Sequence, residues 1–322
     1  MDLTVQKIYK HLLQAQKTII IPHQNPDGDA IGSAAALLEF MEQNNRPAEI
    51  FCVSPLPEKL KFIPHSHRLH NIERVFLDHQ IDTIVVLDSG DLSYAGVDRL
   101  VRNHHATIIN IDHHPTNENY GNYNLVVPTA ASTTEVLFHF FKKTRTPFNH
   151  RLATALLTGL TTDTDNFTNA ATKSDTLHIA GELIHAGGNL NLINTNVVKN
   201  KNISTLKLWG TVLSRLERNP ETNITYTYIN QMDLVEHGVD EAESDGISNF
   251  LNRLDNTPIV LVLKETKTGK IKGSFRTTED DVDVSALAKI FNGGGHKKAA
   301  GFTTEGTIQS VWEKINAELK KR

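Results

Sequence analysis

The chain has 322 residues, which is long enough for two domains because single hydrophobic cores stop growing near about 250 to 300 residues. Charged residues make up 22% and apolar residues 39%, an ordinary composition for a globular protein. The net charge of −4 excludes the basic stripe that binds long nucleic acid, and the single cysteine, Cys52, excludes an intrachain disulfide.

The amino terminus carries no targeting or membrane-spanning pattern. Residues 1–17 hold charges throughout and place Val5, Ile8 and Leu12 on one helical stripe, whereas a secretory signal needs a basic start and an unbroken apolar stretch. No apolar run approaches the roughly 20 residues that cross a bilayer. Together with the lone cysteine, this predicts a cytoplasmic protein that does not bind membranes.

The first half of the chain alternates β-branched runs with helical patterns. Strands are predicted at 18–21, 49–53, 83–87 and 107–111. Helices are predicted at 30–43, 132–144 and 149–162, with others to about 197. This alternation predicts an α/β fold, with a mostly parallel sheet and helices on both of its faces. We assign this domain to residues 1–200.

A smaller α/β domain is predicted over residues 221–322. A helical pattern from Ile203 to Arg218 runs into Asn219-Pro220, so we assign 201–220 to a helix that links the two domains. Beyond it, strands are predicted at 222–229, 258–265 and 270–276, and helices near 241–254, 283–291 and 307–320.

Acidic clusters follow three of the predicted strands. They are His23, Asp27 and Asp29 after 18–21, Asp88 after 83–87, and Asp112-His113-His114 after 107–111. Because loops after the carboxyl ends of parallel strands line one crevice, we expect these clusters to converge. A fourth cluster, with Asp163 and Asp165, ends the helix predicted at 149–162 and would lie along the same rim.

Such a concentration of carboxylates predicts bound cations. Burial and like charge both raise carboxylate pKa values, so these groups do not all stay ionised in a crevice without a counter-charge. Oxygen ligands mixed with imidazoles favour Mn²⁺ over Mg²⁺. The candidate ligands are too many for one such ion and suit two that share a carboxylate. Two ions activate a water and clamp a phosphoryl group, so the clusters predict phosphoester hydrolysis.

In these motifs the sequence resembles the DHH phosphoesterase superfamily. Within it, the resemblance is to the branch of nanoRNase (oligoribonuclease) and pAp-phosphatase enzymes and cyclic-dinucleotide phosphodiesterases. The matching motifs are His23-x-Asn-Pro-Asp27-x-Asp29-x-x-Gly32-Ser33, Asp88, Asp112-His113-His114 and Thr162-Asp163-Thr164. A DHH-associated C-terminal domain is matched by Gly273-Ser274-Phe275-Arg276 and Gly293-Gly294-Gly295-His296.

The resemblance implies two metal ions and a ligand set for each. The implied ligands are His23 and Asp27 for one ion, Asp29, His113 and Asp163 for the other, and Asp88 as the bridge. Many relatives have Thr-Asp-Thr-Gly in the fourth motif, where this chain has Asp165 in place of the glycine. This departure leaves the local backbone, and any extra acidic contact, open; the role of Asp91 is open as well.

The resemblance also implies the catalytic and substrate-binding groups. His114 would face the reacting phosphate, and Asp112 would orient its neighbours. From the second domain, Arg276 and the loop Gly294-Gly295-His296 would bind the nucleotide. Consecutive glycines let backbone N–H groups approach a phosphate, and an arginine grips it with two parallel hydrogen bonds.

The implied function is a two-metal, Mn²⁺-dependent phosphoesterase. Its substrates would be very short oligonucleotides, linear or cyclic dinucleotides, or pAp, which it would cut to mononucleotides. One alternative is an inorganic pyrophosphatase of the same superfamily, although that class has a basic Ser-Arg-Lys segment where this chain has Gly-Gly-Gly-His. A RecJ-like exonuclease is disfavoured because the chain has no extra domains and no basic groove. A nucleotide-binding regulatory protein with a decayed site is disfavoured because every implied ligand is present. A homodimer is left open.

Other histidines are assigned to structural roles. His65, His67 and His70 are not accompanied by a carboxylate cluster in the sequence. His104-His105 precede a predicted strand, which places them at the opposite end of the sheet from the acidic clusters.

Overall fold

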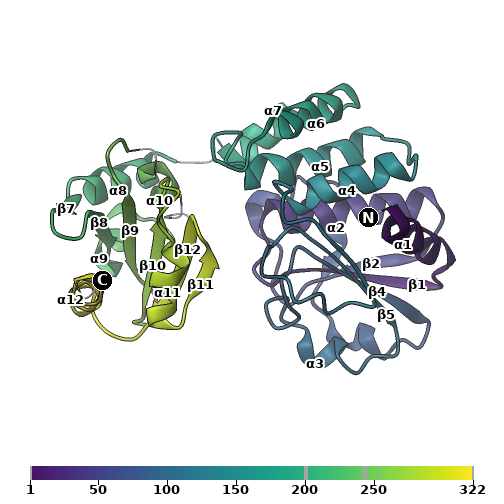
Figure 1. The fold of residues 1–322 in the computed structure, drawn as a ribbon, viewed down its shortest axis with the longest axis horizontal. Coiled ribbons are helices and arrows are strands. Elements are labelled where there is room, and N and C mark those ends of the chain that lie inside the picture. Colours follow the sequence, from purple (N-terminus) through teal and green to yellow (C-terminus); the bar gives the residue numbers. More distant parts are fainter. Residues whose placement is uncertain (1, 199–201, 242–243, 245, 253, 321–322) are drawn as a thin grey trace. The chain divides into compact units, whose positions relative to one another are not determined.

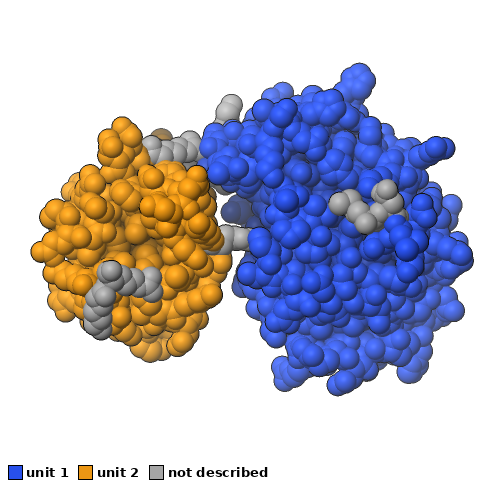
Figure 2. Space-filling view, in the orientation of Figure 1, with its two compact units in different colours: residues 1–200 blue, residues 201–322 orange. Residues whose placement is uncertain are grey.

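The computed structural model describes residues 2–198, 202–241, 244, 246–252 and 254–320 (Figure 1). The chain divides into two compact units, residues 1–200 and 201–322, which carry different colours in Figure 2. Each unit has its own sheet and its own hydrophobic clusters on the two faces of that sheet.

The first unit is built on a six-stranded sheet in the order β3-β2-β1-β4-β5-β6, in which every pairing is parallel. Its strands are β1 (Lys17–Pro22), β2 (Ala48–Phe51), β3 (Leu69–His70), β4 (Ile81–Leu87), β5 (Thr107–Asp112) and β6 (Tyr123–Val126). The chain proceeds outward from β1 to β3 and then returns to place β4 on the other side of β1. The carboxyl ends of β1 and β4 therefore flank the point where a doubly wound sheet binds its ligands.

Helices cover both faces of this sheet, as the sequence predicts. The helices are α1 (Asp2–Gln14), α2 (Gly28–Gln43), α3 (Asp98–Val101), α4 (Thr133–Lys143), α5 (His150–Asp163), α6 (Ser174–His185) and α7 (Leu190–Ile193). Alternate strand residues point to opposite faces. Ile20 packs with α1, α2, α4 and α5, whereas Ile19 and Ile21 pack with Val101 of α3 and with Phe76. The prediction of a parallel α/β sheet with helices on both faces is confirmed (Figure 1).

The second unit is a mixed sheet in the order β11-β12-β10-β9-β8-β7. Its strands are β7 (Glu217–Asn219), β8 (Ile224–Ile229), β9 (Ile259–Glu265), β10 (Ile271–Arg276), β11 (Gly294–His296) and β12 (Ala299–Thr304). Strands β8 and β9 are parallel, and the other pairs are antiparallel. The helices are α8 (Ile203–Leu213), α9 (Gln231–His237), α10 (Ile247–Leu251), α11 (Val284–Ala288) and α12 (Ile308–Leu319). The prediction of a second, smaller α/β domain is thus confirmed.

The helix predicted to link the domains differs from the prediction in length and in place. Helix α8 ends at Leu213, and the chain continues into β7 instead of extending the helix to Arg218. Leu208 and Val212 are fully buried in a cluster with residues of β8 and β9. The hydroxyl of Thr227 on β8 also donates to the carbonyl of Val212 at 2.6 Å. This helix therefore belongs to the second unit, because its apolar face is buried there.

Two other predictions for the second unit need correction. Of the helix predicted near 241–254, the described residues form the short α10, and residues 242, 243, 245 and 253 lie outside the described part of the structure. Helix α9 precedes α10 and is capped by Asn230 at its start and by the left-handed Gly238 at its end. The segment Gly294–His296, predicted as a loop, forms β11 and pairs with β12. Within the described residues, no helix is long and apolar enough to span a membrane.

Candidate metal centre

The turn from β1 into α2 carries three of the predicted ligands. Asp27 caps α2, and its Oδ1 accepts hydrogen bonds from the backbone N–H groups of Asp29 and Ala30 at 3.0 and 3.1 Å. The buried His23 ring lies with Nδ1 2.7 Å from the Gln24 carbonyl. That contact places a proton on Nδ1, and Nε2 faces the carboxylates of Asp27 at 3.8 Å and Asp88 at 3.6 Å.

The carboxylate of Asp29 is fully buried against the start of another helix. Its Oδ2 accepts from the Thr133 N–H at 2.6 Å, and its Oδ1 accepts from the Thr134 N–H at 3.0 Å. Both donors belong to the first turn of α4, where backbone N–H groups have no helical partner and the helix dipole favours a negative charge. The amino terminus of α4 thus stabilises an aspartate that comes from α2.

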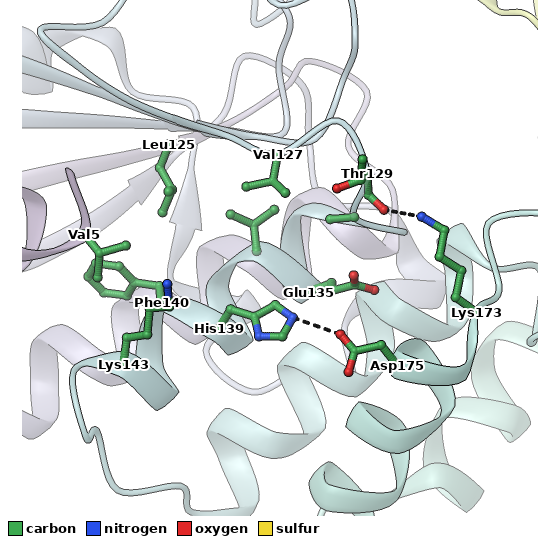
Figure 3. A pocket seen from close by; sticks show the side chains of 12 residues that line it. Val5, Leu125, Val127, Thr129, Glu135, His139, Phe140, Lys143, Lys173 and Asp175 are labelled. Carbon is green, nitrogen blue, oxygen red and sulfur yellow. Dashed lines mark hydrogen bonds and ion pairs between the residues drawn. The ribbon is translucent and has the colours of Figure 1, made fainter. Parts of the chain in front are cut away.

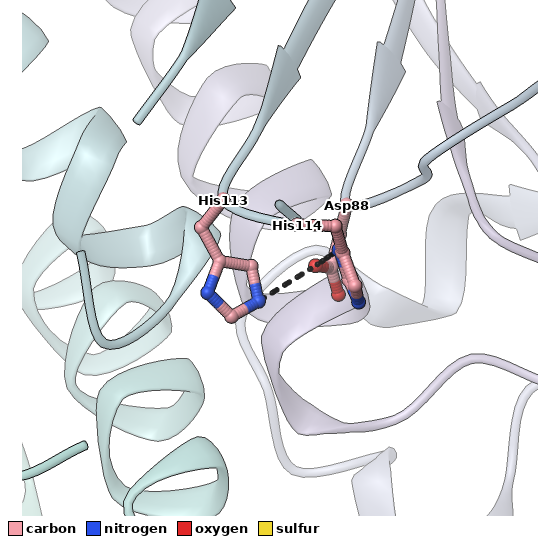
Figure 4. Close-up of side chains that lie close together, drawn as sticks. All are labelled: Asp88, His113 and His114. Carbon is pink, nitrogen blue, oxygen red and sulfur yellow. Dashed lines mark ion pairs between the residues drawn. The ribbon is translucent and has the colours of Figure 1, made fainter. Parts of the chain in front are cut away.

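Asp88 follows β4 directly and has a left-handed backbone, with φ of +58°, which is strained for a residue other than glycine. Its Oδ1 accepts from the Thr133 hydroxyl at 2.9 Å and lies 3.6 Å from His113 Nε2. Its Oδ2 lies 3.6 Å from His23 Nε2. The two oxygens therefore face histidines on different sides, and Figure 4 shows the side facing His113 and His114.

His113 and Asp163 lie together, as the sequence predicts, although His113 directly follows β5 and Asp163 ends α5. His113 Nε2 is 3.4 Å from Asp163 Oδ2. Asp163 is the last residue of α5, and the chain then turns through three left-handed residues, 165–167. Asp165 has φ of +48°, a conformation that glycine adopts without strain and aspartate tolerates better than most residues. Asp165 therefore adopts the left-handed conformation that a glycine at this position would favour.

His114 is held by a chain of hydrogen bonds that begins at the end of β5. Its Nδ1 lies 2.7 Å from Asp112 Oδ1, and Asp112 is fully buried. The Asn117 amide donates to Asp112 Oδ2 at 2.6 Å and also to the Ser89 carbonyl at 3.1 Å. Asp112 thus has a partner on each oxygen and fixes the orientation of the His114 ring.

The ligand atoms of these residues fall into three overlapping groups. Within each group the atoms lie within 4.8 Å of one another, and the groups are His23, Asp27 and Asp88; Asp29, His113 and Asp163; and Asp88, His113 and His114. All six residues predicted as ligands are therefore brought together at the carboxyl edge of the sheet. The third group joins the other two through Asp88 and His113.

Several side chains of the cluster have raised pKa values, as expected for a site that binds a cation. Burial, reinforced by the charge of Asp88, raises the pKa of Asp29 to about 7, and burial with the charge of Asp27 raises the pKa of Asp88 to about 6. Burial also raises the pKa of Asp163 well above its usual range. Burial alone would lower the pKa of His23, but the carboxylates of Asp27 and Asp88 raise it to about 9. The donor set of oxygens and imidazoles fits divalent ions, which would replace these protons.

Three residues that support the site were not identified from the sequence. Thr133 contacts both Asp29 and Asp88, Asn117 holds Asp112, and Gly159 lies on α5 where α5 meets the buried Asp29. A Cβ atom at Gly159 would lie 2.4 Å from Asp29 Oδ1 and 2.4 Å from Thr134 Cγ2. Glycine is therefore required there by close approach.

The residues predicted to bind substrate lie in the second unit. Arg276 ends β10, and its Nε donates to Asn249 Oδ1 at 2.8 Å. In the sheet register both Arg276 and His296 pair with Ala299 of β12, from opposite sides. Gly294 and Gly295 precede His296 on β11, and Gly295 has φ of +138°. The side chain of His296 lies outside the described part of the structure.

For one of the histidines assigned to structural roles, His65, the expected lack of nearby carboxylates is wrong. His65 lies 2.5 Å from Glu39 and 3.8 Å from Glu42, both on α2, so carboxylates do accompany it in space. Glu39 also accepts from Asn149 at 2.6 Å. The two glutamates lie more than 20 residues before His65, which is why sequence proximity did not reveal them. His104 and His105 stack on one another at 4.5 Å.

Substituting Gly159 with alanine should disrupt metal binding. The added methyl group has no room beside Asp29 and Thr134, and overpacking of this kind costs about 1 to 3 kcal/mol. We expect a lower melting temperature and a loss of bound divalent metal, measured by thermal unfolding and elemental analysis. Gly181→Ala on α6 is the matched control, because a Cβ there meets nothing within 4 Å. That variant should be as stable as the parent or more so. Full metal content in Gly159→Ala would contradict this packing argument.

The stabilisation of the protein by an added divalent ion, for which Mn²⁺ serves as the probe, should grow with pH. The pKa values of Asp29, Asp88 and His23 are all raised in the fold without metal, to about 7, 6 and 9. Each therefore contributes stability at low pH that is lost as pH rises through its folded pKa, over a window from about pH 4 to 9. Metal binding needs the deprotonated carboxylates and neutral imidazoles, so it offsets this loss. The rise in melting temperature on adding Mn²⁺ should be larger at pH 8 than at pH 5.5; an equal rise at both would contradict the cause given.

Two family models match the chain. The model of the DHH family, N-terminal domain, matches residues 17–160, and the model of the DHHA1 domain matches residues 221–321. The matched segments fall in the first and second units respectively.

Similar proteins match along most of their length. The bifunctional oligoribonuclease and PAP phosphatase NrnA of Thermus thermophilus is 29% identical over 309 residues, covering 94% of this chain and 90% of the relative. The protein of that name from Bacillus subtilis is 25% identical, with 88% of each chain covered. The crystal structure of an exopolyphosphatase-related protein from Bacteroides fragilis is 26% identical, covers 100% of this chain and 96% of that one, and has a TM-score of 0.92. The chain therefore belongs to the DHH superfamily of phosphoesterases, in the group that carries a C-terminal DHHA1 domain.

Proposed function

We propose that this protein is a two-metal phosphoesterase that hydrolyses very short oligonucleotides, linear or cyclic dinucleotides, or pAp to mononucleotides. Its family makes it a metal-dependent hydrolase of phosphoesters. The substrate class, the number of ions and the identity of the ions are proposals. One observation carries the two-metal assignment. The two oxygens of Asp88 face different histidines, His23 and His113, each at 3.6 Å, and no group of three candidate ligands contains both histidines.

We assign His23 and Asp27 to one ion, Asp29, His113 and Asp163 to the other, and Asp88 to both. Mn²⁺ is the ion proposed, because each group combines an imidazole with carboxylates, whereas Mg²⁺ prefers oxygen ligands alone. When bound, the two ions would supply an activated water and neutralise charge on the phosphoryl group.

The protein's own residues orient the remaining chemistry. The His114 ring is tied through Nδ1 to Asp112 at 2.7 Å, and this contact, together with the nearby charge of Asp88, outweighs burial and raises the pKa of His114. A protonated His114 beside the metal ligands would donate a hydrogen bond to the phosphoryl group. Asn117 keeps Asp112 in place, so Asp112 positions His114 and does not itself contact the substrate. The Thr133 hydroxyl fixes the carboxylate of Asp88 in the same way.

The names of similar proteins and the net charge of the chain both support a short oligonucleotide or a dinucleotide as the substrate. The similar proteins named bifunctional oligoribonuclease and PAP phosphatase match this chain over about nine-tenths of its length. The net charge of −4 disfavours the strongly basic character of proteins that bind the phosphates of a long strand. In the second unit, β11 is the terminal strand of its sheet and holds Gly294 and Gly295, so its backbone can approach a phosphate closely. We propose that β11, with Arg276 and His296, binds one nucleotide of the substrate.

Asp88, the carboxylate assigned to both ions, should be essential for turnover, whereas Asp112 should contribute to turnover without being essential. Asp88→Asn should abolish turnover, because it removes a charge from both ligand groups. Asp112→Asn should reduce turnover about 10- to 100-fold, since it disturbs only the orientation of His114. Purified variants assayed with Mn²⁺ test this, and their folding is checked by circular dichroism. Turnover near that of the parent in Asp88→Asn would exclude a shared ligand.

Substrate length should separate this function from its alternatives. A panel of pyrophosphate, pAp, linear and cyclic dinucleotides, five-nucleotide RNA and 30-nucleotide RNA, each with Mn²⁺, should give the highest rates on pAp or substrates of two to five nucleotides. Hydrolysis of pyrophosphate alone would favour the pyrophosphatase alternative, and no hydrolysis of any substrate would favour a regulatory binding protein. Equal rates on dinucleotides and 30-nucleotide strands would contradict the short-substrate proposal.

Arg276→Ala should weaken the use of short substrates without loss of metal. Losing a charge-assisted hydrogen bond costs about 1.5 to 3 kcal/mol, so kcat/KM should fall about 10- to 100-fold. The matched control is Arg218→Ala on β7, because Arg218 also donates to an asparagine, Asn223, at 3.3 Å. That variant should keep the parental kcat/KM. Metal loss in Arg276→Ala, or an equal fall in kcat/KM in both variants, would contradict the substrate-binding role assigned to Arg276.

A further inference from the structure

A cavity of about 380 Å³ lies in the first unit, between β6, α1, α4 and the start of α6 (Figure 3). Its wall is apolar and is formed by Val5, Leu125, Val127, Val136 and Phe140. Polar side chains line the other part of the cavity, and among them are Glu135, His139 and Asp175. None of these three belongs to the ligand groups that contain Asp88 or His113.

We propose that Glu135, His139 and Asp175 bind a divalent cation. One ligand atom from each lies within 4.8 Å of the other two, and His139 Nε2 is 3.4 Å from Asp175 Oδ2. Glu135 and His139 are four residues apart on α4, so they project from the same face of the helix. Asp175 comes from the first turn of α6. Two helices thus present three ligand atoms at separations that a small movement would close around one ion.

The buried carboxylate of Glu135 is the observation that favours an ion over a simple ion pair. Glu135 is only 6% exposed, and the one donor to its carboxylate among the described residues is the Thr176 hydroxyl, at a long 3.3 Å. A buried carboxylate needs a compensating charge or a full set of donors. Two lysines, Lys143 and Lys173, also line the cavity. The Lys173 ammonium donates to the Thr129 carbonyl at 2.5 Å, and among the described residues no ion pair joins Glu135 to either lysine. A cation beside Glu135 would supply the missing charge.

A second cluster in the same unit contains a buried glutamate, Glu39, that has more hydrogen-bond donors than Glu135. Glu39 is also buried and lies near Glu42 and His65. Its carboxylate, however, is contacted by His65 at 2.5 Å, Asn149 at 2.6 Å and Gln43 at 3.4 Å. Glu39 is therefore satisfied by protein donors, and its cluster is an ion-pair network that joins α2 to the segment around His65.

The ligand set indicates which ions would bind. One imidazole and two carboxylates favour Mn²⁺ or Zn²⁺ over Mg²⁺ and Ca²⁺, which prefer oxygen ligands alone. The side chains of His139 and Asp175 are 43% and 61% exposed, so water can complete the coordination from the open side. Glu135 immediately follows Thr133 and Thr134, whose N–H groups hold Asp29. An ion here would tie the first turn of α4 to α6, and the role that follows is structural.

Counting bound ions tests this proposal. The parent, His139→Gln and Asp175→Asn would be dialysed against the same Mn²⁺ solution, and the ions per chain measured by elemental analysis. The matched control is His178→Gln, because His178 and Glu182 form a pair of the same spacing on α6, at 3.2 Å, without a third ligand from the described residues. The parent and the control should bind one Mn²⁺ more per chain than the other two variants. Zn²⁺ in place of Mn²⁺ should give the same difference.

The comparison does not depend on how many ions the catalytic centre holds, since it rests on a difference between variants. Circular dichroism establishes that each variant is folded. The added Mn²⁺ should also raise the melting temperature of the parent more than that of His139→Gln. Equal Mn²⁺ content in the parent, His139→Gln and Asp175→Asn would overturn the proposal and leave His139 and Asp175 as an ion pair between α4 and α6.

Discussion

Two backbone N–H groups at the start of α4 donate hydrogen bonds to the buried carboxylate of Asp29, and the geometry of the first unit depends on this contact. Asp29 comes from α2, while the amides of Thr133 and Thr134 lie more than 100 residues further along the chain. For the contact to form, α5 must pass so close that only glycine fits at residue 159. One buried carboxylate thus fixes the mutual approach of three helices on the same side of the sheet.

The same arrangement explains how so many acidic groups share one edge. Each aspartate has a separate source of stabilisation within the protein: the first turn of α2 for Asp27, the amides of α4 for Asp29 and the Thr133 hydroxyl for Asp88. These contacts are not enough to ionise every group, because the pKa values of Asp29 and Asp88 stay raised, to about 7 and 6. The fold therefore leaves a deficit of positive charge at this edge, and divalent ions would fill it.

The convergence of the candidate ligands could be predicted from the sequence because the order of a parallel sheet places the ends of its strands at one edge. Once the strands are recognised, Asp88 and Asp112 must lie at the same edge as His23, whatever the loops do. The supporting residues could not be predicted. Thr133 and Asn117 act through single hydrogen bonds to residues distant in sequence or hidden in a loop, and Gly159 matters only because of what packs against it.

The second unit was harder to predict for related reasons. Its edge strand β11 contains two glycines in three residues, a composition that indicates a loop, and it becomes a strand because β12 pairs with it. The helical pattern from Ile203 continues past Leu213, yet the helix ends there and the chain continues into β7. In both places a tertiary contact decides the local structure, and a single sequence does not contain that information in its periodicity.

In the proposed centre, Asp88 lies between two metal ions. The most direct measurement is anomalous diffraction at the manganese edge from crystals soaked in Mn²⁺. The account predicts two peaks about 3.5 to 4 Å apart, one beside His23 and the other beside His113, with one oxygen of Asp88 on each. A single peak, or two peaks of which neither is in contact with Asp88, would contradict it.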